Sequence, residues 1–113
     1  LIRVKSTKFR ASAVSIDEYV AQERLTPNFV KIDAESAECD ILKGMERTLQ
    51  QFRPMISIEV GDMDIKGVVK CRDIVMYLVN KDYDAYEFSR AGIVKHQLKE
   101  RYGYDNILFL PES

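Results

Sequence analysis

Residues 29–33 read Phe-Val-Lys-Ile-Asp, and residues 37–52 follow them with apolar side chains at helical spacing. The first segment is short, mostly apolar and rich in β-branched and aromatic residues, which favours a strand. In the second segment the apolar residues recur every three or four positions, so they lie on one face of a helix. Met55–Val60 has the composition of another strand and begins just after Pro54, where a sheet tolerates proline. This order predicts a parallel strand–helix–strand unit.

The rest of the chain continues the alternation of helices and strands. Ser15 and Glu18 have the spacing of a capping box and predict a helix over Ile16–Glu23. Ser36 is the expected N-cap of the helix over residues 37–52. Residues 94–102 fit either a short helix or an irregular lid. Further patterns predict a strand at Leu1–Lys5, a helix at Val68–Asn80, and strands at Ala85–Ser89 and Asn106–Leu110.

Length and charge limit the classes of protein to consider. The 113 residues are enough for a single domain over residues 1–113, and 17 basic residues against 18 acidic ones give a net charge of −1. A chain with this charge balance lacks the excess of positive charge that binds nucleic acids and anionic membranes. We therefore expect neither as a partner. The longest apolar run, Ile74–Val79, has six residues, whereas a membrane-spanning helix needs about 20.

The two cysteines bear on the compartment. Cys39 and Cys71 both lie in segments expected to be helical, where free cysteines behave as small buried hydrophobes in a reducing environment. We therefore expect a cytoplasmic protein. The chain begins at Leu1 rather than at Met, which suggests an excerpt from a longer protein.

Four carboxylates follow the first two expected parallel strands. Asp33 and Glu35 come after the first strand, and Glu59 and Asp62 come at the end of the second. Ligands of open α/β sheets bind outside the carboxyl ends of the strands, so these acids form a candidate site. Such carboxylates can take a proton, orient a hydroxyl or hold a divalent cation. The alternative is that they are exposed acids stabilised by a helix dipole.

Lys31 interrupts a strand that is otherwise apolar. An ammonium group buried without a partner is costly, and Glu59 ends the next strand. We therefore predict a structural Lys31–Glu59 ion pair, with a catalytic Lys31 as the alternative.

Recognisable metal and nucleotide motifs are missing from the sequence. The loop Asp62–Gly67 begins like an EF-hand, but Lys66 occupies a position that needs a ligand oxygen. His96 is the only histidine and has no second His or Cys at ligand spacing, so we expect a surface residue, with a general base as the alternative. Neither G-x-G-x-x-G nor a P-loop occurs.

Residues 30–44 resemble the signature of FkbM-type methyltransferases, which reads K-I-D-x-E-G-x-E and continues into a helix that contains L-x-G. Three further segments resemble the family in the same order. They are residues 15–19, residues 53–60 with the pattern R-P…E-V, and the closing strand at residues 104–111. Ser36 stands where the family pattern has Gly.

The resemblance implies an α/β fold: a three-layer sandwich with a mixed sheet, forming the C-terminal part of a Rossmann-like class I methyltransferase fold. It implies an S-adenosylmethionine-dependent enzyme that transfers methyl to a hydroxyl of a small molecule or sugar, with the cofactor bound mainly by residues upstream of this chain. Asp33 and Glu35 would be catalytic. Ser36, Glu59 and Asp62 would bind the substrate.

Two other functions remain open from the sequence. One is a metal-dependent hydrolase or nuclease that uses Asp33, Glu35 and Glu59 as cation ligands. The other is a non-catalytic module that pairs with a partner, or with a second copy of itself, through an exposed sheet edge at Val30 and Ile32.

Overall fold

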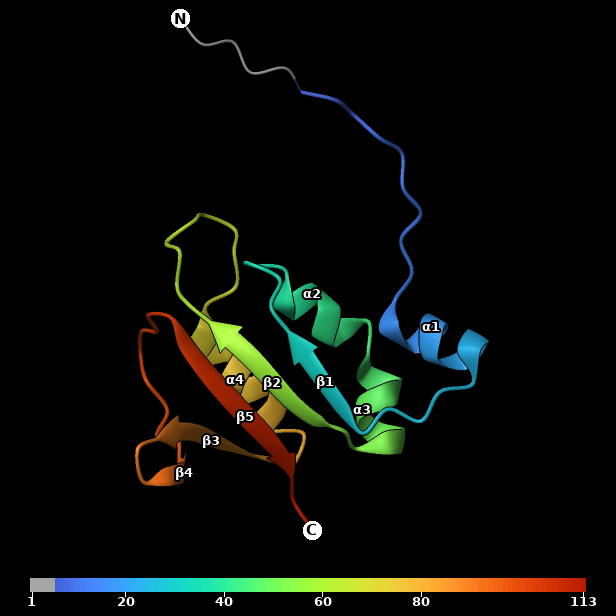
Figure 1. Ribbon diagram of the computed structural model, residues 1–113. Helices are drawn as coiled ribbons and strands as arrows, with labels where there is room; N and C mark the ends of the chain where they lie inside the picture. The colour runs from blue at the N-terminus through green and yellow to red at the C-terminus, as the bar shows by residue number, and fades with distance from the viewer. Residues whose placement is uncertain (1–5) are drawn as a thin grey trace, which may run out of the picture.

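The computed structural model describes residues 6–113, so the strand expected at Leu1–Lys5 lies outside the described residues. Residues 6–14 form neither helix nor strand and extend away from the sheet (Figure 1). The elements that follow are α1 (Ile16–Glu23), β1 (Phe29–Ile32), α2 (Glu38–Lys43), α3 (Glu46–Phe52), β2 (Met55–Val60), α4 (Cys71–Val79), β3 (Tyr83–Ser89), β4 (Gly92–Lys95) and β5 (Asp105–Pro111).

The sheet is mixed and has five strands in the order β1-β2-β5-β3-β4. β1 and β2 are parallel neighbours, as predicted. β5 lies between β2 and β3 and is antiparallel to both, so β3 runs parallel to β2 without touching it. β1 therefore has one neighbour among the described residues and is an edge strand.

The core lies on one face of this sheet. Alternate residues of the strands point toward it, and they pack with the buried side chains of α2, α3 and α4 in one cluster. The residues between them point to the other face, where Phe29 and Met55 are exposed. The described residues thus form two layers, and the three-layer sandwich is not confirmed. The strand residues of the core are Ile32, Ile56, Ile58, Val60, Tyr83, Ala85, Ile107 and Phe109.

The single helix expected over Ala37–Phe52 is wrong, because the structure has two helices, α2 and α3, separated near Gly44. The cause lies in α1. The Asp17 backbone N–H donates to the Gly44 carbonyl at 2.9 Å, and the Asp17 carboxylate accepts hydrogen bonds from the backbone N–H groups of Arg47 and Thr48. These bonds end α2 and cap α3. The apolar residues therefore stay at helical spacing, although one continuous helix does not form.

Ser36 does not cap α2, contrary to the prediction. The N-cap is Ala37, and no side chain of the described residues caps the helix start. Ser36 instead has a φ of +84° and follows Glu35 with a φ of +41°. Both residues are in left-handed conformation, so the chain turns sharply between β1 and α2.

The short helix that was one alternative for residues 94–102 does not form. A hairpin pairs β3 with β4, and irregular chain follows β4 up to β5. His96 lies at the start of this irregular segment and is 7% exposed. The expectation of a surface histidine is therefore wrong, because the His96 ring is enclosed between β3 and the chain that follows it.

Candidate active site

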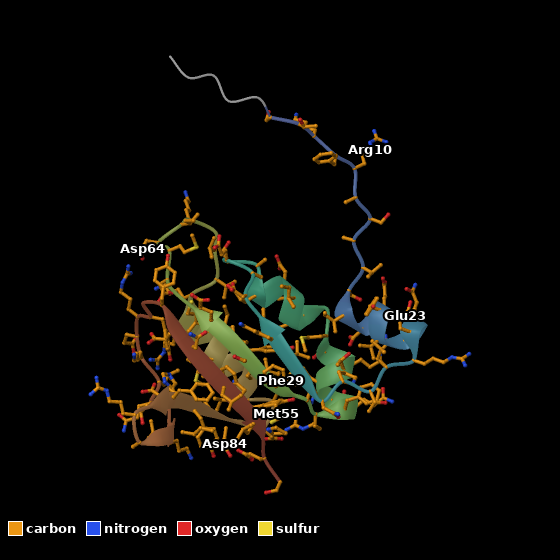
Figure 2. All side chains as sticks on the ribbon, viewed as in Figure 1. Arg10, Glu23, Phe29, Met55, Asp64 and Asp84 are labelled. Atoms are coloured by element: carbon orange, nitrogen blue, oxygen red, sulfur yellow. The ribbon has the colours of Figure 1, made fainter. Side chains whose placement is uncertain are left out.

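A pocket of about 190 Å³, called the carboxylate pocket below, lies at the carboxyl ends of β1 and β2. In Figure 2, Phe29 and Met55 mark the other end of these strands, and Asp64 marks the loop that follows β2. The pocket contains three of the four carboxylates predicted from the strand ends. Its lining residues are Asp33, Glu35, Ser36, Glu38, Glu59, Gly61, Met63 and Tyr104.

The strand register brings Asp33 and Glu59 to the same edge of the sheet. Ile32 pairs with Ile58, and both are buried against the helices. The next residue along each strand is Asp33 or Glu59, and successive side chains alternate between the faces of a sheet. The two carboxylates therefore belong to the open side, where the core does not enclose them.

The turn after β1 brings Glu35 and Ser36 to the pocket. A non-glycine residue with positive φ is uncommon because its Cβ crowds the backbone. At Ser36, the position of the family glycine, φ is +84°. The turn explains why glycine suits this position.

Replacing Ser36 with Gly is expected to stabilise the protein by about 0.5 to 1 kcal/mol, because glycine adopts this φ without steric cost. The midpoint of urea unfolding measures the change. Ser36→Ala is the matched control, since alanine also lacks the hydroxyl but keeps the Cβ. Equal stabilisation by both substitutions would contradict the conformational explanation.

Glu38 is a pocket residue that the site prediction missed. It begins α2 and is 6% exposed, yet no described residue donates a hydrogen bond or forms an ion pair with its carboxylate. No fully buried side-chain oxygen in residues 6–113 lacks a partner. The Glu38 oxygens therefore keep some exposed surface, and the residue lines both this pocket and a neighbouring one of about 100 Å³.

Asp62 lies outside the pocket and supports the loop beside it. Its carboxylate accepts hydrogen bonds from the backbone N–H groups of Cys71 at 3.0 Å and Tyr102 at 2.7 Å. Burial raises the pKa of Asp62, but these bonds outweigh it and the net pKa is lowered. Burial, together with the Asp62 charge, raises the pKa of the Cys71 thiol to about 11. Cys71 is thus an unreactive core residue. The hydrogen bonds of Asp62 connect α4 to the segment before β5.

The predicted ion pair between Lys31 and Glu59 does not form among the described residues. Lys31 pairs along the backbone with Ser57, and its side chain is exposed. β1 is an edge strand with an open outer face, so the ammonium stays hydrated and needs no counter-charge.

A second, larger cavity of about 470 Å³ follows the free edge of β1. Its walls are mainly apolar residues of β1, α2 and the chain before α1, and Lys31 and Asp40 add charges. Asp33 lines this cavity as well as the carboxylate pocket. Asp33 therefore lies where the two spaces meet.

The described residues contain no group of three or more His, Cys, Asp or Glu side chains placed to hold a metal ion. Both ring nitrogens of His96 contact other side chains inside the fold. Its Nδ1 lies 2.8 Å from Glu87 Oε2, and its Nε2 lies 2.7 Å from the Tyr102 hydroxyl. The metal-dependent hydrolase is therefore not favoured.

Comparison with protein families gives a match to the Methyltransferase FkbM domain over residues 3–85. The chain belongs to the FkbM methyltransferase domain family. The family resemblance of the sequence is thereby confirmed, and the mixed five-stranded α/β fold fits such a domain. Comparison with curated proteins and with solved structures found no significant match.

Most of the carboxylate pocket lies inside the matched part of the FkbM domain. Of the lining residues, Tyr104 alone comes from beyond residue 85.

Within residues 6–113, no helix has both the length and the hydrophobicity needed to cross a bilayer.

Proposed function

We propose that this chain is the acceptor-side part of an S-adenosylmethionine-dependent methyltransferase that transfers methyl to a hydroxyl oxygen of a small molecule or sugar. The observation that carries the proposal is the pocket at the ends of β1 and β2, where Asp33, Glu35 and Glu59 converge in an FkbM chain.

The pocket residues suit methylation of a hydroxyl. Methyl transfer is an in-line displacement, so the protein must align the acceptor oxygen and remove its proton. Asp33 or Glu35 accepts a hydrogen bond from the acceptor hydroxyl and takes its proton as methyl is transferred. Glu59 and Ser36 flank these two residues and contact the rest of the acceptor.

The pocket also fits the charge of the proposed cofactor. S-adenosylmethionine supplies an electrophilic methyl group on a positively charged sulfur, and carboxylates stabilise positive charge nearby. Asp33 lines both the pocket and the cavity along β1, so its charge is available to both. We propose that the cofactor is held mainly by residues upstream of this chain and that residues 1–113 are the C-terminal part of a Rossmann-like domain.

Methyl transfer by the full-length protein tests the proposal. With tritiated S-adenosylmethionine and a panel of hydroxylated acceptors, Asp33→Asn or Glu35→Gln is expected to lower kcat by about 100-fold, the usual loss when a general base is removed. Asp73→Asn is the matched control, because Asp73 is exposed on α4 and lines neither the pocket nor the cavity along β1. Undiminished rates in both pocket variants would overturn the assignment.

A further inference from the structure

The carboxylate pocket has an unbalanced charge. Four of its eight lining residues are Asp or Glu, and no described Lys, Arg or His lines it. Arg101 pairs with Asp64 and Lys99 with Asp105 at 3.5 Å, while Lys31 lines the cavity along β1 and not this pocket. Among the described residues, none of the four pocket carboxylates forms an ion pair.

Glu38 shows that this charge is more than an exposed acidic patch. It is 6% exposed, and a buried carboxylate is costly unless something pairs with it. No described residue supplies a partner, the carboxylate oxygens are not fully buried, and the residue lines the pocket. A ligand that brings a positive charge would supply the missing partner.

The chemistry of the lining narrows the kind of cation. The described carboxylates are not arranged to hold a metal ion, which leaves an organic cation. An ammonium group donates three hydrogen bonds, which matches a lining that consists mainly of acceptors. Tyr104 is 88% exposed, so its ring face is free for a cation at the pocket mouth. An anionic acceptor would be repelled by the same four carboxylates.

We infer that the methyl acceptor is a cationic, amine-bearing polyhydroxyl compound, with its ammonium bound by Glu38 and Glu59 and its hydroxyl directed to Asp33 and Glu35. That this cation is the methyl acceptor rests on the proposed function. The binding of an organic cation by this pocket does not.

Three sugars with the same ring but different charge test the inference: glucosamine at mildly acidic pH, where its amine is protonated, glucose, and glucose 6-phosphate. In NMR titrations of this chain, glucosamine is expected to shift the amide signals of residues 33–38 and 59–61. It should bind about fivefold or more tightly than glucose, the size expected of one partly screened charge contact. Glucose 6-phosphate should not bind.

Glu38→Gln is expected to weaken glucosamine binding by about fivefold, while the control Asp73→Asn, which removes the same charge on exposed α4 away from the pocket and the cavity along β1, leaves it within about twofold. Glu38→Gln should also melt at the same temperature as the unsubstituted chain or higher, because it removes an unpartnered buried charge. Equal binding of the three sugars, or a lower melting temperature for Glu38→Gln, would overturn the inference.

The two proposals fail in different ways. If glucosamine binds in the pocket but the full-length protein methylates no hydroxyl, the cation site stands and the proposed function is wrong. If the protein methylates neutral acceptors and glucosamine does not bind in the pocket, the function stands and the inferred acceptor class is wrong.

Discussion

Replacing Asp17 with Ala is expected to destabilise the protein by about 3 kcal/mol, the sum of several hydrogen bonds to a charged group. Asp17 Oδ1 accepts from the Thr48 backbone N–H at 2.7 Å and from the Thr48 hydroxyl at 2.6 Å, and Oδ2 accepts from the Arg47 N–H at 3.0 Å. No other side chain caps α3. The substitution leaves these donors without a partner, and Thr48 is 2% exposed.

The same bonds make stability depend on pH. Burial raises the pKa of Asp17, but the hydrogen bonds from Thr48 and Arg47 outweigh it, so the folded pKa lies below the ordinary value of 3.8. A carboxyl with a lowered folded pKa stabilises the fold fully above its unfolded pKa and loses this contribution as the pH falls through the folded value. The difference between the unsubstituted chain and Asp17→Ala should therefore be constant near neutrality and shrink below about pH 3.8.

Urea unfolding at several pH values measures both effects. Asp73→Ala is a suitable control, because Asp73 is an exposed acid in the first turn of α4 and contributes at most about 1 kcal/mol through the helix dipole. If both variants lose the same stability, the cap is not the source of the effect.

Replacing Tyr102 with Phe is expected to cost about 2 to 3 kcal/mol, although only one oxygen is removed. Tyr102 is 1% exposed. Its hydroxyl accepts a hydrogen bond from the Lys99 N–H at 3.1 Å and contacts His96 Nε2. A carboxylate can only accept, so in the tautomer that carries its proton on Nδ1, His96 donates to Glu87 and its Nε2 accepts from the Tyr102 hydroxyl. Phenylalanine would leave Nε2 buried without a donor.

Tyr104→Phe is the matched control, because Tyr104 is 88% exposed, and its loss of stability should stay within about 0.5 kcal/mol. His96→Leu and the double variant complete a thermodynamic cycle. A coupling energy between His96 and Tyr102 below about 0.5 kcal/mol would show that the two side chains do not act together.

Local sequence signals predicted most elements, and the errors arose where distant residues decide the structure. The capping box gave the bounds of α1 because Ser15 and Glu18 interact within one turn. The break between α2 and α3 depends on Asp17, which lies 30 residues before Arg47. Similarly, the burial of His96 depends on the β3–β4 hairpin, which brings it to Glu87, and on the irregular chain that follows, which brings Tyr102 to its ring.

The candidate site was predictable in outline because local sequence signals predicted the strands that carry it. Asp33, Glu35 and Glu59 follow from the strand order, because parallel strands end at one edge of a sheet. Glu38 was missed, since its position in the first turn of a helix suggests an exposed acid. Asp62 was expected to bind substrate, but no local pattern shows that its carboxylate bonds to Cys71 and Tyr102. The positive φ of Ser36 was signalled only by the glycine that the family pattern has at this position.

The one-sided core of the sheet has a consequence for evolution. In β1 and β2 the residues that hold the fold together alternate with those that point to the open face, such as Lys31, Ser57 and Glu59. Substitutions at the second set leave no cavity in the core, so they change stability little. The open face can thus change in sequence while the buried face stays fixed, so its surface chemistry can alter without a compensating change in the interior.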